Sequence, residues 1–219
     1  MSTHSVKSFP LPSIQRLPVY LRFLKEQQNR GEVLVSCTRI AEEFGQLSVQ
    51  VRKDLSITGI TGRPKVGYRV NELIDAIEDF LGWNNKINAY LVGAGSLGSA
   101  ILGYEGFTEH GLNIVAAFDV DPEKIGQVIH RCSVYDLSKM VEMGKKGSIE
   151  IGILTVPSIA AQETASMLVG VGVQAIWNYT PVRLDLPSEV ICEDVKLSAS
   201  FAVLSSRLKK RTVFHGENE

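Results

Sequence analysis

The sequence predicts an α/β protein in which an N-terminal winged helix-turn-helix precedes a doubly wound parallel sheet and a C-terminal helix. Three observations support this fold class. Two short helical patterns meet at Gly45, a strand pattern runs directly into "VGAGSLGSA", and strand and helix patterns then alternate. We place the domain boundaries at 1–82 for the winged helix, 83–194 for the sheet and 195–219 for the terminal helix and tail.

Composition narrows the class of protein. The 219 residues are 44% hydrophobic and 21% charged, which is typical of a globular chain. No apolar run is long enough to span a membrane, and the first residues lack the apolar core of a signal peptide, so we expect a cytoplasmic protein without a membrane partner. The three cysteines have no metal-ligand spacing, so no metal site is expected.

The helix-turn-helix prediction rests on residues 36–59. Ser36 or Thr38 can cap a first short helix, and Ser48 can cap a second one, whose buried face is apolar. The outer face of the second helix carries side chains suited to base edges and phosphates, namely Gln50, Arg52 and Lys53. This helix is the candidate recognition helix.

The segment "GITGRPKVGYRV" is typical of a β-hairpin wing. Arg63 and Lys65 are expected at its tip, with an alternating end at Val66, Tyr68 and Val70. Residues 1–71 contain eleven basic and five acidic residues, a net charge of +6, which leaves −7 for the remainder. We therefore predict DNA contacts from Arg63, Lys65 and Tyr68, and from the recognition-helix residues Ser48, Gln50, Arg52 and Lys53. The alternatives are a helical domain with a charged exterior and a winged helix that docks a protein.

The most specific motif is the glycine turn of Tyr90 to Ala100. Gly93, Gly95 and Gly98 satisfy G-x-G-x-x-G between a strand and a helix, the context of a Rossmann-like dinucleotide site. The first glycine permits the tight turn, the second lets the backbone approach a pyrophosphate, and the third lets helix and strand pack closely. The predicted site also includes the intervening residues Ala94, Ser96 and Leu97.

The end of the second strand, "FDVDPEK", suggests which nucleotide binds. An acid at this place accepts hydrogen bonds from a ribose diol and repels a 2′-phosphate, so NAD(H) is favoured over NADP(H). Coenzyme A, a related nucleotide, is the alternative ligand for this site. The predicted contacts here are Asp119, Val120, Asp121 and Lys124.

Two later strand ends are candidate walls for the nicotinamide half. Ligands of a doubly wound sheet lie beyond the carboxyl ends of its strands. The residues at those ends are Thr155, Val156 and Pro157 after one strand, and Asn178 and Tyr179 after the next. The alternative for each is ordinary loop and turn chemistry.

The sequence shows no catalytic constellation. Tyr135 and Lys139 match a Tyr-x-x-x-Lys pair, but they fall between the second strand and the strand near Ile149, where a dehydrogenase would not place them. The four histidines (His4, His110, His130 and His215) form no acid–base pattern, and little sequence is left for a substrate domain. We therefore predict a protein that senses the dinucleotide. The alternative is an NAD-dependent oxidoreductase with a fused accessory domain.

Several motifs together resemble the redox-sensing transcriptional repressors called Rex. They are "VQVRKDLS", "VGYRV", "LVGAGSLGSA", "FDVDPEKIG", "LTVPSIAAQ" and "NYTPVRLDLP", and the resemblance runs from about Ile14 to Leu208. It implies a homodimer with swapped C-terminal helices that binds palindromic operator DNA. It also implies that NAD⁺ permits DNA binding and that NADH releases the repressor.

The resemblance assigns roles to residues that the motifs alone do not explain. Tyr104 matches a tyrosine that helps to distinguish the two nicotinamide states, and Arg22 matches an arginine of an interdomain ion pair. The acid expected opposite that arginine is Lys196 here. Pro64-Lys65 replaces Arg-Gly in the wing, and Ser56 to Gly59 replaces an aromatic segment. A diverged paralogue with another operator or a weaker redox response is therefore a further alternative.

Overall fold

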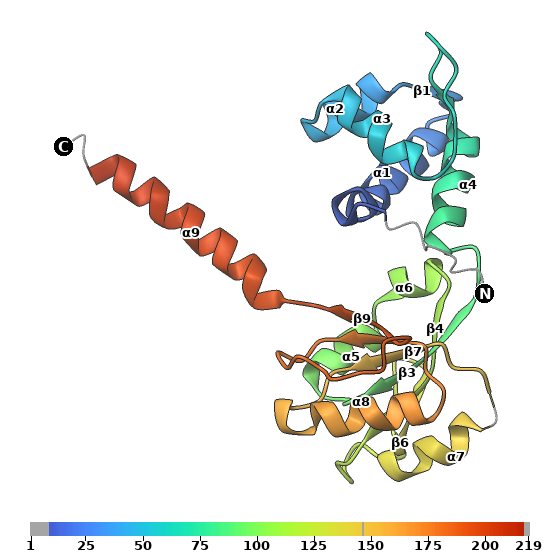
Figure 1. The fold of residues 1–219 in the computed structure, drawn as a ribbon, viewed down its shortest axis with the longest axis vertical. Coiled ribbons are helices and arrows are strands. Elements are labelled where there is room, and N and C mark those ends of the chain that lie inside the picture. The colour runs from blue at the N-terminus through green and yellow to red at the C-terminus, as the bar shows by residue number, and fades with distance from the viewer. Residues whose placement is uncertain (1–8, 146, 217–219) are drawn as a thin grey trace. The chain divides into compact units, whose positions relative to one another are not determined.

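The computed structural model describes residues 9–145 and 147–216, with side chains up to residue 209 in the last helix. Residues 1–8 and 217–219 of the predicted end domains lie outside this range. The chain forms two compact units, residues 1–85 and 86–219 (Figure 1), and each is described by itself. None of the described helices combines the length and the apolar character needed to cross a membrane.

The first unit is a helical domain with a small antiparallel ribbon. Its elements are α1 (Leu11–Asn29), β1 (Leu34–Val35), α2 (Cys37–Phe44), α3 (Ser48–Ser56), β2 (Tyr68–Arg69) and α4 (Val70–Leu81). One core joins the helices, because the 3–4 spacing of apolar residues places them on one face of each helix. The largest fully buried members are Leu17, Tyr20, Leu21, Leu24, Ile40, Leu55, Leu73 and Ile77.

The two short helices α2 and α3 begin differently. Ser36 caps α2 as predicted, since its hydroxyl oxygen accepts from the Arg39 amide at 3.1 Å. Gly45 then ends α2 with a left-handed backbone, φ +61°. The predicted cap of α3 was wrong. The cap residue is Leu47, Ser48 is the first residue of the helix, and no side chain caps this helix.

The wing is tighter than the predicted hairpin. Strand β2 contains only Tyr68 and Arg69, which pair with β1, and Val70 already starts α4. The tip closes through two backbone bonds between Arg63 and Gly67, of 2.7 and 2.9 Å. A Cβ on Gly67 would lie 2.3 Å from the carbonyl oxygen of Val35, so only glycine fits where the wing crosses β1.

The second unit is built on a seven-stranded sheet in the order β5-β6-β4-β3-β7-β8-β9, parallel except for β5. The order is doubly wound, since the chain builds outward from β3 first on one side and then on the other. The strands are β3 (Ile87–Val92), β4 (Leu112–Asp119), β5 (Val128–Ile129), β6 (Cys132–Asp136), β7 (Ile151–Leu154), β8 (Ala175–Asn178) and β9 (Ile191–Asp194).

Helices cover both faces of this sheet (Figure 1). They are α5 (Ser96–Leu102) and α6 (Glu105–Glu109) on one face, and α7 (Met140–Gly144) and α8 (Ala161–Gly170) on the other. Short 3₁₀ turns, η1 (Leu137–Lys139) and η2 (Ser158–Ala160), precede α7 and α8. The predicted fold class is confirmed, although β5, β6 and β9 were missed. All four residues of β9 are exposed, so it lacks the apolar pattern on which the prediction relied.

The last helix, α9 (Leu197–Gly216), differs from the others because its described side chains are all exposed. Its apolar residues Leu197, Phe201, Leu204 and Leu208 are 61–70% exposed. Their spacing of four, three and four residues places them on one stripe of the helix. The helix therefore carries an apolar stripe that is largely exposed in the described structure.

Candidate functional site

The glycine turn is held by close backbone contacts. A Cβ on Gly98 would lie 2.0 Å from the carbonyl oxygen of Gly93, and one on Gly93 would lie 2.6 Å from that of Thr155. Gly93 also has φ +99°. A Cβ on Gly95, by contrast, would meet no atom within 4 Å. The first and third glycines are therefore required by packing, and the second leaves open space where a pyrophosphate would lie.

Between these glycines, the three other predicted residues lie at different depths. Ala94 is buried, whereas Ser96 and Leu97 are exposed at the start of α5. The Ala94 amide donates to Asp119 Oδ2 at 2.7 Å, which fastens the turn to the end of β4. Of these three residues, only Ser96 and Leu97 are thus accessible at the surface.

Asp119 is mainly a structural carboxylate. It is 9% exposed, and its Oδ1 accepts from the amides of Val120 and Asp121 at 2.8 and 2.9 Å. Burial alone would raise its pKa, but the amides of Asp121 and Ala94 and the nearby Lys124 ammonium outweigh burial and lower the pKa. Its oxygens are engaged by these donors, so Asp119 organises the loop that also carries Asp121.

Asp121 is the more open acid of this loop. Its side chain is 38% exposed and lies 3.3 Å from Lys124 Nζ, which also lies 3.4 Å from Asp119. Val120 is exposed beside it. A carboxylate that faces solvent at this position can accept the two ribose hydroxyls, as the sequence predicted for the loop.

The predicted nicotinamide walls are partly used by the fold itself. The Thr155 hydroxyl lies within hydrogen-bond distance of the carbonyl oxygens of Val92 and Gly93, at 3.0 and 2.8 Å, so it supports the glycine turn from below. Asn178 is fully buried, and its amide donates to Val182 O and Asp194 Oδ1, both at 2.9 Å. These two side chains organise loops, which is the alternative that the sequence left open.

The remaining wall residues keep accessible surface. Val156 and Tyr179 are half-buried and Pro157 is exposed. The Tyr179 ring packs 5.2 Å from that of Trp177, and burial raises the pKa of the Tyr179 hydroxyl. Phe107 connects Trp177 to Tyr104, with ring centroids 5.1 and 4.6 Å apart. This row of rings places Tyr104, which is 59% exposed, on the same face as Tyr179.

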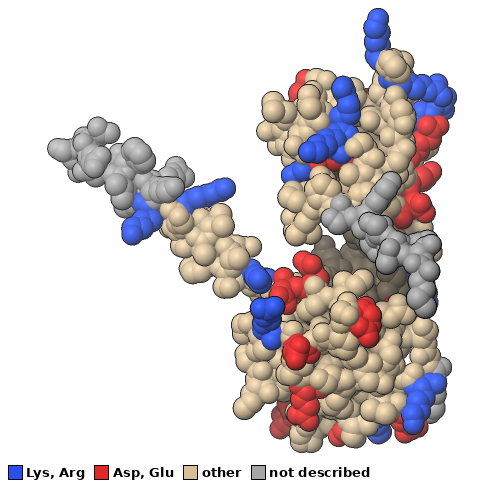
Figure 2. All heavy atoms as spheres, viewed as in Figure 1, with Lys and Arg blue, Asp and Glu red and all other residues tan. Residues whose placement is uncertain are grey.

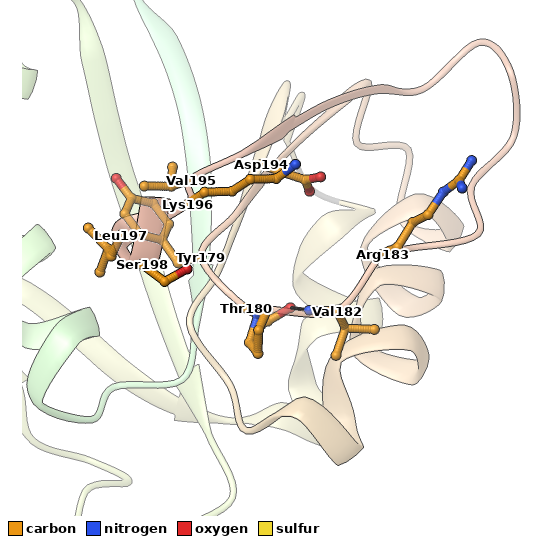
Figure 3. Close-up of a pocket in the computed structure, with 10 residues that line it drawn as sticks. Tyr179, Thr180, Val182, Arg183, Asp194, Val195, Lys196, Leu197 and Ser198 are labelled. Atoms are coloured by element: carbon orange, nitrogen blue, oxygen red, sulfur yellow. Dashed lines mark hydrogen bonds between the residues drawn. The ribbon is translucent and has the colours of Figure 1, made fainter. Parts of the chain in front are cut away.

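A hollow of about 650 Å³ lies beyond the carboxyl ends of β8 and β9 (Figure 3). The loop after β8 contributes Thr180, Val182 and Arg183, and the segment before α9 contributes Asp194 and Lys196. Sequence reasoning missed this loop as a lining element. Its signal was the Asn178 side chain, which accepts from Thr180 and donates to Val182, and so folds the loop back on itself.

Three basic residues of the first unit line a second hollow, of about 710 Å³, between α3 and the wing. Arg52, Arg63 and Lys65 line it, and Lys53 is exposed nearby on α3. Figure 2 shows basic side chains gathered at the wing. We call Arg52, Lys53, Arg63 and Lys65 the basic face. Its charge and shape suit a nucleic-acid backbone.

Three predicted DNA contacts lie differently. Tyr68 is only 7% exposed, and its ring packs so closely on Gly62 that a Cβ there would lie 2.8 Å from it. Tyr68 therefore belongs to the core and offers DNA little surface to contact. Ser48 and Gln50 are half-buried. Gln50 Nε2 donates to Asp54 Oδ1 at 2.8 Å, an i to i+4 contact within α3.

Sequence reasoning missed the buried ion pair behind the basic face. Arg16 of α1 donates to both oxygens of Asp54 of α3, at 2.6 and 2.7 Å, and Asp54 is fully buried. The available signal was an acid on the inner face of an otherwise basic helix, beside Val51 and Leu55. Such an acid needs a cationic partner, because an unpaired buried charge is strongly unfavourable.

The Tyr135 and Lys139 pair has no dehydrogenase geometry. Tyr135 lies on strand β6 and Lys139 on the turn η1, so they do not share a helical face. Within the described residues, no group of three potential metal ligands comes together. The arrangement in the second unit is that of a nucleotide-binding sheet.

Comparisons with known proteins agree with both halves of the chain. Residues 8–56 match the family model "Putative DNA-binding protein N-terminus", and residues 84–182 match "CoA binding domain". The redox-sensing transcriptional repressor Rex of Treponema denticola is 49% identical over 88% of this chain and 92% of its own. That of Carboxydothermus hydrogenoformans is 42% identical over 94% and 100%.

Solved structures extend the likeness to three dimensions. RSP in complex with β-NAD⁺ and operator DNA superposes with a TM-score of 0.88 at 35% identity, over 97% of this chain and 100% of RSP. RSP in complex with β-NADH superposes with a TM-score of 0.84 at 34% identity, over 96% and 98%. Another structure of RSP is described as a Rex-family repressor. The chain therefore belongs to the Rex family of redox-sensing transcriptional repressors.

Proposed function

We propose that this protein is a redox-sensing transcriptional repressor, which binds palindromic operator DNA as a homodimer and is released when NADH binds. One observation carries the proposal: almost all of the chain, 97% and 96%, superposes on RSP, a repressor captured with operator DNA and NAD⁺ and also with NADH. The open glycine turn and the basic face supply a fitting surface for each ligand. The protein is then a sensor of the cofactor, without an enzymatic reaction.

The proposed NAD(H) site lies at the carboxyl edge of the sheet. The turn positions the pyrophosphate through its backbone amides, Asp121 accepts the ribose hydroxyls, and Tyr179 and Tyr104 flank the nicotinamide half. The fit is supported by the open space at Gly95 and the exposed acid at Asp121. The full set comprises Gly93, Ala94, Gly95, Ser96, Leu97, Gly98, Tyr104, Asp119, Val120, Asp121, Lys124, Thr155, Val156, Pro157, Asn178 and Tyr179.

The proposed DNA surface consists of the basic face together with Ser48 and Gln50 at the start of α3. Lysine and arginine neutralise phosphates, while the side chains of α3 enter the major groove. Tyr68 supports the wing from the core. An operator-binding protein acts where the DNA is, so we infer a cytoplasmic location. We keep the proposed domains at 1–82, 83–194 and 195–219.

The apolar stripe of α9 supports the homodimer. Leu197, Phe201, Leu204 and Leu208 are exposed together, which a partner subunit would cover. Leu204→Glu should therefore yield monomers in sedimentation velocity, whereas Ser206→Glu, on the opposite side of the helix, should leave the dimer intact. Dimers in both variants would refute this interface.

Lys196 favours a second candidate, a paralogue with a weaker redox response. It is exposed at the hollow that Arg183 also lines. A lysine cannot form the ion pair with Arg22 that the family resemblance implies, because like charges repel. The two candidates predict different coupling between NADH and DNA.

Fluorescence anisotropy tests both candidates. The probe is a palindromic duplex selected by this protein from a randomised pool, measured without cofactor, with NAD⁺ and with NADH. Tight binding that survives NAD⁺ and is lost with NADH supports the redox repressor. Specific binding that ignores both cofactors supports the uncoupled paralogue. If no sequence-specific, salt-dependent binding is found under any of these conditions, both candidates are refuted.

A further inference from the structure

Asp54 is a fully buried carboxylate on a helix whose outer face is basic. Its bidentate ion pair with Arg16 joins α3 to α1. The Tyr20 hydroxyl lies 2.9 Å from Asp54 Oδ2 and 2.5 Å from Gln46 Oε1, which adds the turn between α2 and α3 to the network. The donors from α1 are enough to balance the charge, yet Asp54 also binds a group on the DNA side.

That group is the side-chain amide of Gln50, whose Nε2 donates to Asp54 Oδ1 at 2.8 Å. A free glutamine amide can rotate by half a turn and exchange its donor and acceptor ends. Beside Asp54 it cannot do so, because the carbonyl oxygen would then face a carboxylate oxygen. The NH₂ group therefore faces Asp54, and the carbonyl oxygen and one N–H remain for another partner.

Gln50 lies at the border between the buried and the exposed face of α3, two residues before the exposed pair Arg52 and Lys53. We propose that Asp54 is a positioning residue for DNA recognition: it holds the Gln50 amide in one orientation and thereby selects adenine at one position of each half-site. This inference rests on the proposed function.

Adenine follows from the chemistry of the oriented amide. In the major groove, adenine offers the N6 amino donor beside the N7 acceptor, which matches a carbonyl oxygen beside an N–H. Guanine offers two acceptors, O6 and N7, and would oppose the carbonyl oxygen. An amide that is free to turn could present its NH₂ end to guanine O6, so release of Gln50 should weaken the preference.

The test measures dissociation constants for the duplex selected from a randomised pool and for versions with symmetric A·T to G·C changes, scanned along each half-site. The Gln50→Ala variant identifies the base pair that Gln50 contacts, because the A·T to G·C change at that position no longer alters the dissociation constant. We expect the wild-type protein to prefer A·T there by about tenfold. Asp54→Asn should reduce that preference to about twofold, with unchanged affinity and salt dependence on a non-specific duplex.

Tyr20→Phe is the matched control, since it removes another contact of Asp54 and leaves Gln50 tethered. It should keep the tenfold preference. If Asp54→Asn does not fold, Arg16→Met/Asp54→Leu replaces it, because removal of both charges leaves neither one unpaired.

A preference kept by Asp54→Asn or by the double variant, but lost in Gln50→Ala, would overturn the positioning role. A Gln50→Ala variant with wild-type preferences at every position would overturn it as well. A wild-type protein that selects no duplex would instead refute the proposed function, so the two failures are distinguishable.

Discussion

The nucleotide turn of the second unit and the wing of the first both contain left-handed backbone, but they differ in whether the surrounding space admits a side chain. At Gly93 and Gly98 the space is filled by backbone, so no side chain fits. At the wing tip, φ of Lys65 is +61°, yet its side chain is exposed. Steric exclusion therefore dictates glycine in the turn, whereas the wing tip tolerates a strained residue that can contribute a charge.

The two units also hold their buried carboxylates differently. Backbone amides hold Asp119, and most of these bonds persist whatever the neighbouring side chains are. Side chains from other segments hold Asp54. The proposed nucleotide site is consequently held mainly by backbone groups, and the proposed DNA surface by side chains from separate segments. Four experiments probe this contrast.

The largest effect is expected for Gly98→Ala. Its Cβ would lie 2.0 Å from a backbone oxygen, so α5 must move. We expect the free energy of unfolding to fall by about 3 kcal/mol and the NADH affinity to fall by about 100-fold, measured by urea unfolding and NADH fluorescence. Gly95→Ala should lose affinity without loss of stability. Wild-type affinity in both variants would refute the assigned turn.

Gly67→Ala is the corresponding change in the wing. It combines a Cβ 2.3 Å from Val35 O with φ +93°, so we expect a loss of about 2–3 kcal/mol in stability. DNA affinity should fall while NADH titrations stay unchanged. Gly59→Ala has a similar φ of +82° in open space and should cost about 1 kcal/mol. Equal losses in both variants would mean that the contact with Val35 contributes nothing.

Acid should weaken the ion pair between Arg16 and Asp54 by protonating the Asp54 carboxylate. Burial alone would raise the pKa of Asp54, but hydrogen bonds from Arg16 and its neighbours outweigh burial and lower it from 3.8 to about 2. A lowered pKa gives stability that is complete above pH 3.8 and is lost as the pH falls toward 2. We expect a loss of about 2 kcal/mol in that window, measured by urea unfolding. Arg16→Met/Asp54→Leu, which removes both charges, should abolish this dependence, and an unchanged profile would contradict the assignment.

Lys65→Gly should have the smallest effect and the opposite sign for stability. Glycine adopts φ +61° without strain, so we expect a gain of about 1 kcal/mol in the free energy of unfolding. DNA binding should weaken. The factor by which affinity falls between about 50 and 200 mM salt should become about 3.5-fold smaller, as expected for the loss of one phosphate contact. Lys65→Arg should keep the wild-type salt dependence. An unchanged salt dependence in Lys65→Gly would show that the tip does not contact DNA.

Local patterns were sufficient to predict much of the molecule. The strand before Gly93, the three glycines and the Ser36 cap all depend on residues close together in the chain, and the structure has them as expected. Strand β9 was missed, because its four exposed residues have no apolar alternation. The cap of α3 was misplaced by one residue, because the cap residue Leu47 has no polar side chain that could mark the position.

The sequence by itself determined the order of the two modules, the glycine turn and the basic character of the first third, because propensity, spacing and charge are local properties. The tertiary structure alone decided how individual side chains are used. It engaged Asp119 and Asn178 within the fold, buried Tyr68, and brought Arg16 to Asp54 across 38 residues. Hydrogen-bond partners and burial depend on which distant segments meet, and spacing along the chain does not encode that directly.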